Sequence, residues 1–206
     1  EDENASRGAF GPALAALRGD TSINEVILSG GDPLTLGDRR LGMLLDELQA
    51  IGHLRRVRLH TRLPIVLPER IDAAFVELWS AVRLQKVVVV HANHANEIGD
   101  GVRAGLTRLA ATGSTLLNQS VLLRGINDDA RVLAELSETL FAAGVLPYYL
   151  HLLDRVTGSA HFEVPEHEAR RLWSEISARL PGYLVPRLVR EIPGAPAKTM
   201  LPPASR

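Results

Sequence analysis

The sequence predicts an α/β domain with a parallel β-sheet, because short β-branched stretches alternate along the chain with longer stretches at helical spacing. The β-branched stretches read as strands that are apolar on both faces, as in sheets buried between other layers. Links from helix to strand are short, whereas several links from strand to helix are long and polar. In such folds the carboxyl ends of the strands carry the functional residues, whether the sheet is a barrel or open.

The strands expected from these patterns are Glu25–Ser29, Val57–Thr61, Lys86–His91, Thr115–Leu123 and Leu146–Leu152. The helices expected are Asp38–Ile51, Pro68–Val82, Glu97–Thr112, Asp128–Ala143 and Pro165–Leu180. From Gly182 the chain reads as a further extended segment followed by a Pro/Gly-rich loop. No internal repeat or low-complexity linker interrupts the pattern, so residues 1–206 are expected to form one domain, with residues 182–206 as its tail.

The composition excludes several classes of protein. The 206 residues are 46% hydrophobic, enough for a buried core, and carry 23 basic and 24 acidic residues. This balance argues against a nucleic-acid binder that relies on bulk charge. No stretch is long enough to span a membrane and no signal peptide opens the chain, so we expect a cytoplasmic protein without membrane contact. The chain has no cysteine, which excludes disulfides, thiolate metal sites and an iron–sulfur cluster ligated from within it.

Polar residues collect at the carboxyl ends of the expected strands. Four such clusters are Ser29–Pro33, His60–Arg62, His91–Glu97 and His151–Arg155, and a further polar group, Asn118–Ser120, lies within the fourth strand. Loops are polar in any protein, but four of five strands ending in such clusters at one edge of a sheet favour a functional site there.

Each cluster has two interpretations. Gly30 and Gly31 with Asp32 can form an ordinary tight turn, or they can let backbone groups approach a ligand while Asp32 faces a cationic group. His91 and His94 are spaced to ligate a metal, but histidines in loops are more often solvated or hydrogen-bonded. Gln119 lies in an apolar strand, so its amide needs partners, which a neighbouring backbone or a ligand can supply.

The chain has only two lysines. Lys86 precedes a strand, which places it at the edge opposite the expected site, and it reads as a surface residue. Lys198 lies in the Pro/Gly-rich loop, seven residues after Glu191. It can be an ordinary tail lysine, or an amine that forms a Schiff base with an aldehyde cofactor such as pyridoxal phosphate.

Six segments together resemble the lysine 2,3-aminomutase family of radical S-adenosylmethionine (SAM) enzymes. In family order they are Leu28–Leu34, His60–Ile71, His91–Glu97, Leu116–Asp128, Pro147–Phe162 and Gly182–Thr199. They span nearly the whole chain. Within the family, the resemblance is greater to the branch that supplies (R)-β-lysine for elongation factor P.

The resemblance implies a partial (β/α)6 TIM-like barrel that uses a [4Fe–4S] cluster, SAM and pyridoxal phosphate. The segment Ser29-Gly30-Gly31-Asp32 matches the motif that holds the SAM amino group, and His91 and Gln119 match positions that contact SAM. Lys198 matches the lysine that forms the internal aldimine with pyridoxal phosphate.

Asp154 and Glu191 match the two acidic positions that bind the ε-ammonium of the substrate. A buried ammonium needs paired carboxylates, so L-lysine is the substrate that this pair implies. The implied reaction converts L-lysine to β-lysine: a SAM-derived radical removes a β-hydrogen and the amino group migrates from C2 to C3 on pyridoxal phosphate.

The chain departs from the family in one respect. Members carry a Cys-x3-Cys-x2-Cys motif, which binds the cluster, just before the glycine-rich strand, and this chain has no cysteine. We therefore expect the 206 residues to be the C-terminal part of such an enzyme, lacking the first strand and the cluster loop. Such a part is expected to be inactive alone, and its exposed sheet edge leaves association into a homo-oligomer open.

Three alternatives remain. The first is a lysine 2,3-aminomutase of lysine catabolism, which performs the same chemistry; the loop Ile192–Lys198 lacks the run of glycines common in that branch. The second is a metal-dependent hydrolase on a barrel that uses His60, His91, His151 and Asp154. The third is an inactive fragment with a binding or structural role.

Overall fold

The computed structural model describes residues 2–154, 157–195 and 197–201. Its centre is one curled sheet in which the strands follow one another in chain order from β1 to β7. The strands are β1 (Glu25–Leu28), β2 (Arg56–Thr61), β3 (Gln85–Val90), β4 (Thr115–Leu122), β5 (Leu146–Leu152), β6 (Arg187–Arg190) and β7 (Thr199–Met200). Strands β1 to β6 pair in parallel, and β7 pairs antiparallel with β6. The partial TIM-like barrel is therefore confirmed.

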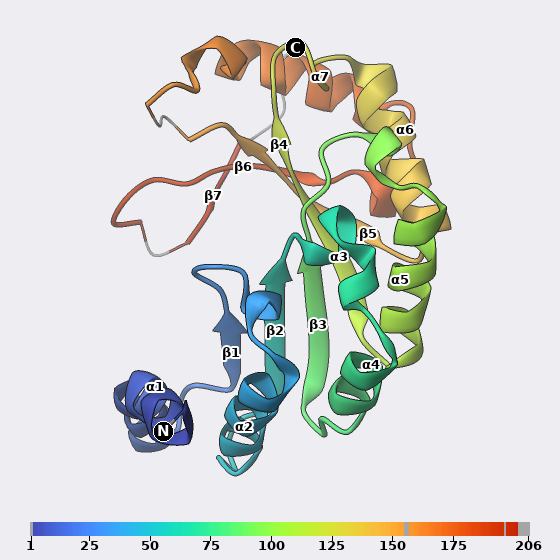
Figure 1. Cartoon of the computed structure of the whole chain (residues 1–206). Helices are drawn as coiled ribbons and strands as arrows, with labels where there is room; N and C mark the ends of the chain where they lie inside the picture. The colour runs from blue at the N-terminus through green and yellow to red at the C-terminus, as the bar shows by residue number, and fades with distance from the viewer. Residues whose placement is uncertain (1, 155–156, 196, 202–206) are drawn as a thin grey trace.

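Helices lie along the outer side of the curled sheet (Figure 1). They are α1 (Asp2–Gly19), α2 (Asp38–Gln49), α3 (Leu63–Val66), α4 (Ala73–Ser80), α5 (Asp100–Ala111), α6 (Ala130–Ala142) and α7 (Glu166–Ser177). Each parallel strand from β1 to β5 is followed by a helical segment before the next strand begins. This alternation places the carboxyl ends of the parallel strands at one edge.

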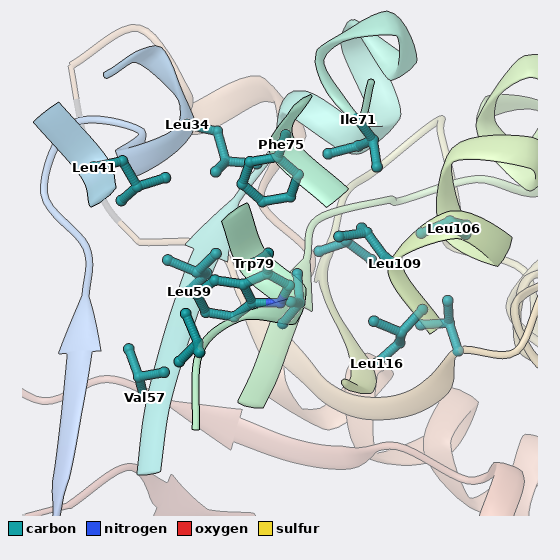
Figure 2. Packing of buried hydrophobic residues seen from close by; sticks show 14 of the residues in the cluster. Leu34, Leu41, Val57, Leu59, Ile71, Phe75, Trp79, Leu106, Leu109 and Leu116 are labelled. Atoms are coloured by element: carbon teal, nitrogen blue, oxygen red, sulfur yellow. The ribbon is translucent and has the colours of Figure 1, made fainter. Parts of the chain in front are cut away.

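The main core lies between the sheet and helices α2, α4 and α5. Val57 and Leu59 of β2 point into it, together with Phe75 and Trp79 of α4 (Figure 2). A second cluster joins β4, β5 and β6 to helices α6 and α7. The helix side of the sheet is therefore the apolar side.

The expectation that every strand is apolar on both faces is wrong for β2. Its residues alternate between buried Val57, Leu59 and Thr61 on the helix side and half-buried Arg56, Arg58 and His60 on the other. Strand β4 alternates in the same way, with Gln119 on the half-buried face. The inner face of the sheet is thus partly polar, as in a barrel whose interior holds a ligand.

Two of the predicted helices begin later than expected. Pro68 starts a 3-10 turn (Pro68–Arg70), and α4 begins only after Asp72, whose carboxylate accepts the Phe75 N–H at 2.8 Å. Glu97 likewise closes a 3-10 turn (Ala95–Glu97), and α5 begins at Asp100. Helix α1 and the one-turn helix α3 were not predicted. In the predicted tail, residues 196 and 202–206 lie outside the described residues.

Candidate active site

A cavity of about 750 Å³ lies on the inner face of the sheet, toward the carboxyl ends of its strands. Every predicted site residue except Asp154 lines it, namely Ser29, Gly30, Gly31, Asp32, His91, Gln119, Glu191 and Lys198. The cluster His60–Arg62, expected at this edge, also lines it, together with residues that were not predicted, namely Ile27, Arg58, Tyr148, Tyr149 and Ala197. Residues from six strands or their ends, far apart in the sequence, thus meet at one site.

The glycine loop follows β1 and depends on its two glycines. Gly30 and Gly31 have φ angles of 84° and 65°, in the left-handed region that side chains with a Cβ rarely adopt. A Cβ at either position would meet no other atom within 4 Å. The glycines are therefore needed for the backbone turn, and they leave open space beside the cavity.

Asp32 holds this loop against the end of β2. Its Oδ1 accepts the Leu34 N–H at 3.0 Å and the Thr61 hydroxyl at 2.7 Å, and its Oδ2 accepts the Arg62 N–H at 2.6 Å. Three protein donors thus occupy a carboxylate that the sequence suggested would face a ligand. We conclude that Asp32 positions the loop, and that only its remaining acceptor capacity can serve a ligand.

Asp32→Asn is expected to lower the free energy of unfolding by about 1–3 kcal/mol. Whichever way the new amide turns, its NH2 group faces an N–H or O–H donor that now needs an acceptor. Urea denaturation would measure the change. The matched control is Asp129→Asn: Asp129 caps α6 by accepting the Arg131 N–H at 2.7 Å, and asparagine caps helices equally well. Equal effects of the two substitutions would contradict this role of Asp32.

His91 and Gln119 meet on the cavity wall, where Gln119 Nε2 lies 3.3 Å from His91 Nε2. The β4–β5 register shifts between Asn118 and Gln119, which places Gln119 opposite Tyr149. Asn118, on the helix side, bonds the backbone N–H and C=O of Ala92 and thereby ties β4 to the end of β3. Because successive residues of β4 face opposite sides of the sheet, the Asn118 amide points into the fold and the Gln119 amide into the cavity.

Four buried polar atoms on the inner face have no hydrogen-bond partner among the described residues. They are Arg58 Nε, His60 Nε2, Gln119 Oε1 and His151 Nε2. Buried polar groups are nearly always paired, so three unpaired atoms on residues that line the cavity, with a fourth on His151 beside Glu191, indicate a site that a ligand completes. Gln119 Oε1 needs a donor and Arg58 Nε needs an acceptor, so the ligand must carry both.

The histidines of this face are neutral at pH 7. Burial, with help from the charge of Arg58, lowers the pKa of His60 to about 4. Burial also lowers the pKa of His151 to about 4, with Lys198 as the next cause. The pKa of His91 is lowered by burial and by Arg62, against an opposing effect of Asp32. Uncharged imidazoles can donate or accept hydrogen bonds without adding charge to the site.

Lys198 and Glu191 form an ion pair at the cavity edge. The contact lowers the pKa of the Glu191 carboxyl. His151 Nδ1 lies 3.8 Å from the same carboxylate oxygen, and the Lys198 ammonium lies 5.7 Å from the centre of the Tyr149 ring. Lys86 lies outside the cavity, where its ammonium donates to the Val82 carbonyl at 3.1 Å, as expected for a residue at the opposite edge.

Asp154 is exposed just beyond β5 and does not line the cavity. It lies close enough to act on the pKa of His151, which it raises. Residues 155 and 156 lie outside the described part of the chain. The structure therefore brings together eight of the nine predicted site residues and leaves Asp154 nearby.

The residues proposed for a barrel hydrolase do not assemble a metal site. Within the described ranges, no three His, Asp or Glu side chains converge in an arrangement that could hold a metal ion. His94 instead caps a 3-10 turn, accepting the Asn96 N–H at 3.1 Å, while Glu97 accepts the backbone N–H of His94 at 2.8 Å. His91 therefore lines the cavity, whereas His94 caps the 3-10 turn.

The sequence analysis missed Arg58, Tyr148 and Tyr149. It placed His60, Thr61, Arg62 and His151 in polar clusters at the strand ends, but gave a chemical role only to the two histidines, as metal ligands of the alternative hydrolase. The alternation of Arg56–Thr61 was a usable signal for part of this set. It places Arg58 and His60 on one face of a strand whose other face is apolar. The two tyrosines had no such signal, because both could have been core residues.

Among the described residues, no helix is long and apolar enough to cross a membrane.

The chain is similar to proteins named L-lysine 2,3-aminomutase. It is 51% identical to the one from Escherichia coli over 92% of this chain and 55% of the relative. Identity to the Haemophilus influenzae protein is 48%, over 97% of this chain and 59% of the relative. Identity to the Clostridium subterminale protein is 34%, over 98% of this chain and 48% of the relative. The chain thus spans about half the length of each of these relatives, between 48% and 59%. No family model matches it.

Two solved structures share the fold. One is a radical SAM methyltransferase from Sphaerobacter thermophilus, with a TM-score of 0.59 at 15% identity over 82% of this chain and 51% of that one. The other is a domain of pyruvate-formate lyase-activating enzyme from Bacteroides vulgatus, with a TM-score of 0.52 at 14% identity. The match covers 81% of this chain and 98% of that one. At such identities the likeness shows the fold alone. Over nearly its whole length, the chain is therefore similar in sequence to proteins named L-lysine 2,3-aminomutase.

Proposed function

We propose that this chain carries the substrate- and cofactor-binding part of an L-lysine 2,3-aminomutase, which converts L-lysine to β-lysine with SAM and pyridoxal phosphate. The observation that carries the proposal is the gathering of the glycine loop, His91, Gln119, Glu191 and Lys198 in one cavity. The names of the relatives support the reaction, and the barrel fold supports the use of SAM.

The residues near the end of β1 fit SAM. Gly30 and Gly31 leave open space, and Gln119 Oε1 is a buried acceptor that still needs a donor, such as an amine or hydroxyl. Lys198 fits pyridoxal phosphate, because its side chain reaches the cavity and is 29% exposed. When bound, SAM supplies the radical that abstracts hydrogen, and pyridoxal phosphate carries the migrating amino group.

This chain supplies no thiolate ligand to an iron–sulfur cluster, because its 206 residues contain no cysteine. Its own residues orient the reactants and keep their charges paired. Asp32 fixes the glycine loop, His91 and Gln119 present neutral polar groups, and Glu191 offers a carboxylate to a cationic amine. We propose that Asp154, the second acidic residue, also contacts the ammonium of substrate lysine.

We further propose that the product serves the modification of elongation factor P rather than lysine catabolism. The support is the loop Ile192–Lys198, which lacks the glycine run common in the catabolic branch. The two branches differ in the configuration at C3, so chiral analysis of the β-lysine produced by the holoenzyme distinguishes them. The R product is expected, and the S product would assign the chain to catabolism.

Borohydride reduction of the chain with pyridoxal phosphate is expected to label Lys198, as shown by peptide mapping. Lys198→Ala is expected to reduce the labelling at least about tenfold, whereas Lys86→Ala leaves it unchanged. Lys86 is a demanding control, because burial lowers its pKa and so favours its reactive neutral form. A label on Lys86, or no label on a well-folded chain, would overturn the assignment of Lys198.

A further inference from the structure

The Lys198 ammonium has two partners in the cavity that together are typical of amine recognition. One is the Glu191 carboxylate, with which it forms an ion pair. The other is the Tyr149 ring, whose centre is 5.7 Å from Nζ. A carboxylate supplies a charged acceptor, and an aromatic face attracts a cation through its negative quadrupole. The two residues come from the loop after β6 and from β5, respectively.

Glu191 is the carboxylate that balances this cation. The neighbouring His60 and His151 are neutral at pH 7, since burial holds the pKa of each at about 4. Asp32 lines the same cavity, but three protein donors occupy its oxygens. Asp154, the second acidic residue proposed to contact the substrate, is exposed and does not line this cavity, so a second ammonium placed against Glu191 would compete with Lys198 for the Glu191 charge.

From these contacts we infer that Glu191 and the ring of Tyr149 form an ammonium-binding pocket that Lys198 fills while its amine is free. This inference rests on the proposed function, in which the side-chain ammonium of substrate lysine takes the same place when it first binds, while Lys198 is engaged with the aldehyde. It assigns Tyr149 as a substrate-binding residue and makes the availability of Glu191 depend on Lys198.

The Schiff-base chemistry proposed for Lys198 would release Glu191 from its ion pair with the Lys198 ammonium. The ammonium gives one proton to solvent, and the amine then condenses with an aldehyde. A C=N bond forms, and the carbonyl oxygen leaves as water with the two remaining amine hydrogens. The nitrogen is then no longer an ammonium with three donors, so Glu191 loses its partner and the pocket opens to another cation.

The test measures L-lysine binding to the cofactor-free chain by isothermal titration calorimetry, with L-norleucine as the matched probe that lacks the side-chain amine. Lys198→Ala is expected to bind L-lysine roughly fivefold more tightly than the unaltered chain does, in line with release of a partly exposed ion pair. Lys198→Arg keeps the charge and is expected to bind like the unaltered chain, as is Lys86→Ala. L-norleucine binding should not change.

Adding Glu191→Gln or Tyr149→Leu to Lys198→Ala is expected to remove the gain, whereas adding Tyr149→Phe, which keeps the ring, should preserve it. Equal L-lysine affinity of Lys198→Ala and the unaltered chain would overturn the inference, as would an equal gain for L-norleucine. A different outcome would contradict the proposed function alone. If Lys198→Ala binds L-lysine more tightly but pyridoxal phosphate does not label Lys198 in the unaltered chain, the cofactor role is refuted and the ammonium-binding pocket is still supported.

Discussion

Lowering the pH from 7 to 5 is expected to reduce the free energy of unfolding by about 4 kcal/mol through His60 and His151 alone. The pKa of each is about 4 in the folded chain, against an ordinary value near 6.5 once unfolded. Between about pH 4 and pH 6.5 the two histidines are protonated in the unfolded state but neutral in the folded state. The free energy of unfolding therefore falls as the pH drops below about 6.5. Each histidine contributes about 2 kcal/mol at pH 5.

Urea denaturation at pH 7 and pH 5 measures this loss. His60→Asn and His151→Asn are each expected to remove about half of it, because asparagine does not titrate. His167 provides the matched control: it is exposed on α7, and His167→Asn should leave the pH dependence unchanged. A stability that stays flat between pH 7 and pH 5 would show that the two imidazoles are not neutral and buried as described.

Replacing Trp79 with alanine is expected to cost about 3–5 kcal/mol of unfolding free energy. Trp79 is fully buried between α4 and the sheet, stacked on Phe75 with ring centres 6.2 Å apart (Figure 2). Its indole N–H also donates to the Ser114 hydroxyl at 2.8 Å. The alanine variant therefore leaves a cavity in the main core and removes one hydrogen bond of the Ser114 hydroxyl, which keeps its contact with the Thr112 hydroxyl at 2.8 Å.

Trp173 is the control for this substitution. It is only partly buried on α7, where its indole N–H donates to the Pro186 carbonyl at 2.7 Å. Trp173→Ala is expected to cost clearly less, and Trp79→Phe, which keeps a ring but loses the hydrogen bond, about 1–2 kcal/mol. A Trp79→Ala variant as stable as Trp173→Ala in thermal and urea unfolding would contradict the packing described here.

The strands could be predicted because their signal is local. Runs such as Lys86–His91 are β-branched and short, and the five expected strands match β1 to β5 within a residue or two at each end. Helix starts were less predictable. Pro68 has the residue type of a helix start but begins a 3-10 turn, and the cap that starts α4 is Asp72. Helix α1 was missed because it contains Gly11 and Pro12, which usually interrupt a helix.

The site could be predicted only where a residue type was unusual for its place. Gln119 in an apolar strand, Lys198 in a Pro/Gly-rich loop and two adjacent glycines after a strand are such residues, and all line the cavity. Arg58 was missed although the alternation of its own strand places it on the polar face. Tyr148 and Tyr149 were missed because tyrosine is ordinary in strands, and their importance depends on what faces them across the sheet, which a single strand does not reveal.

By itself, the sequence determined the alternation of strands and helices, the absence of thiolate ligands and the residues that resemble a lysine 2,3-aminomutase. Only the tertiary structure decided which of those residues meet. It placed Glu191 and Tyr149 beside Lys198, although Tyr149 is 49 residues from it in the chain, and it left Asp154 outside the cavity. It also turned the carboxylate of Asp32 toward protein donors. The physical reason is that backbone propensity acts over a few residues, whereas burial, ion pairing and hydrogen-bond satisfaction depend on segments that only the curled sheet brings together.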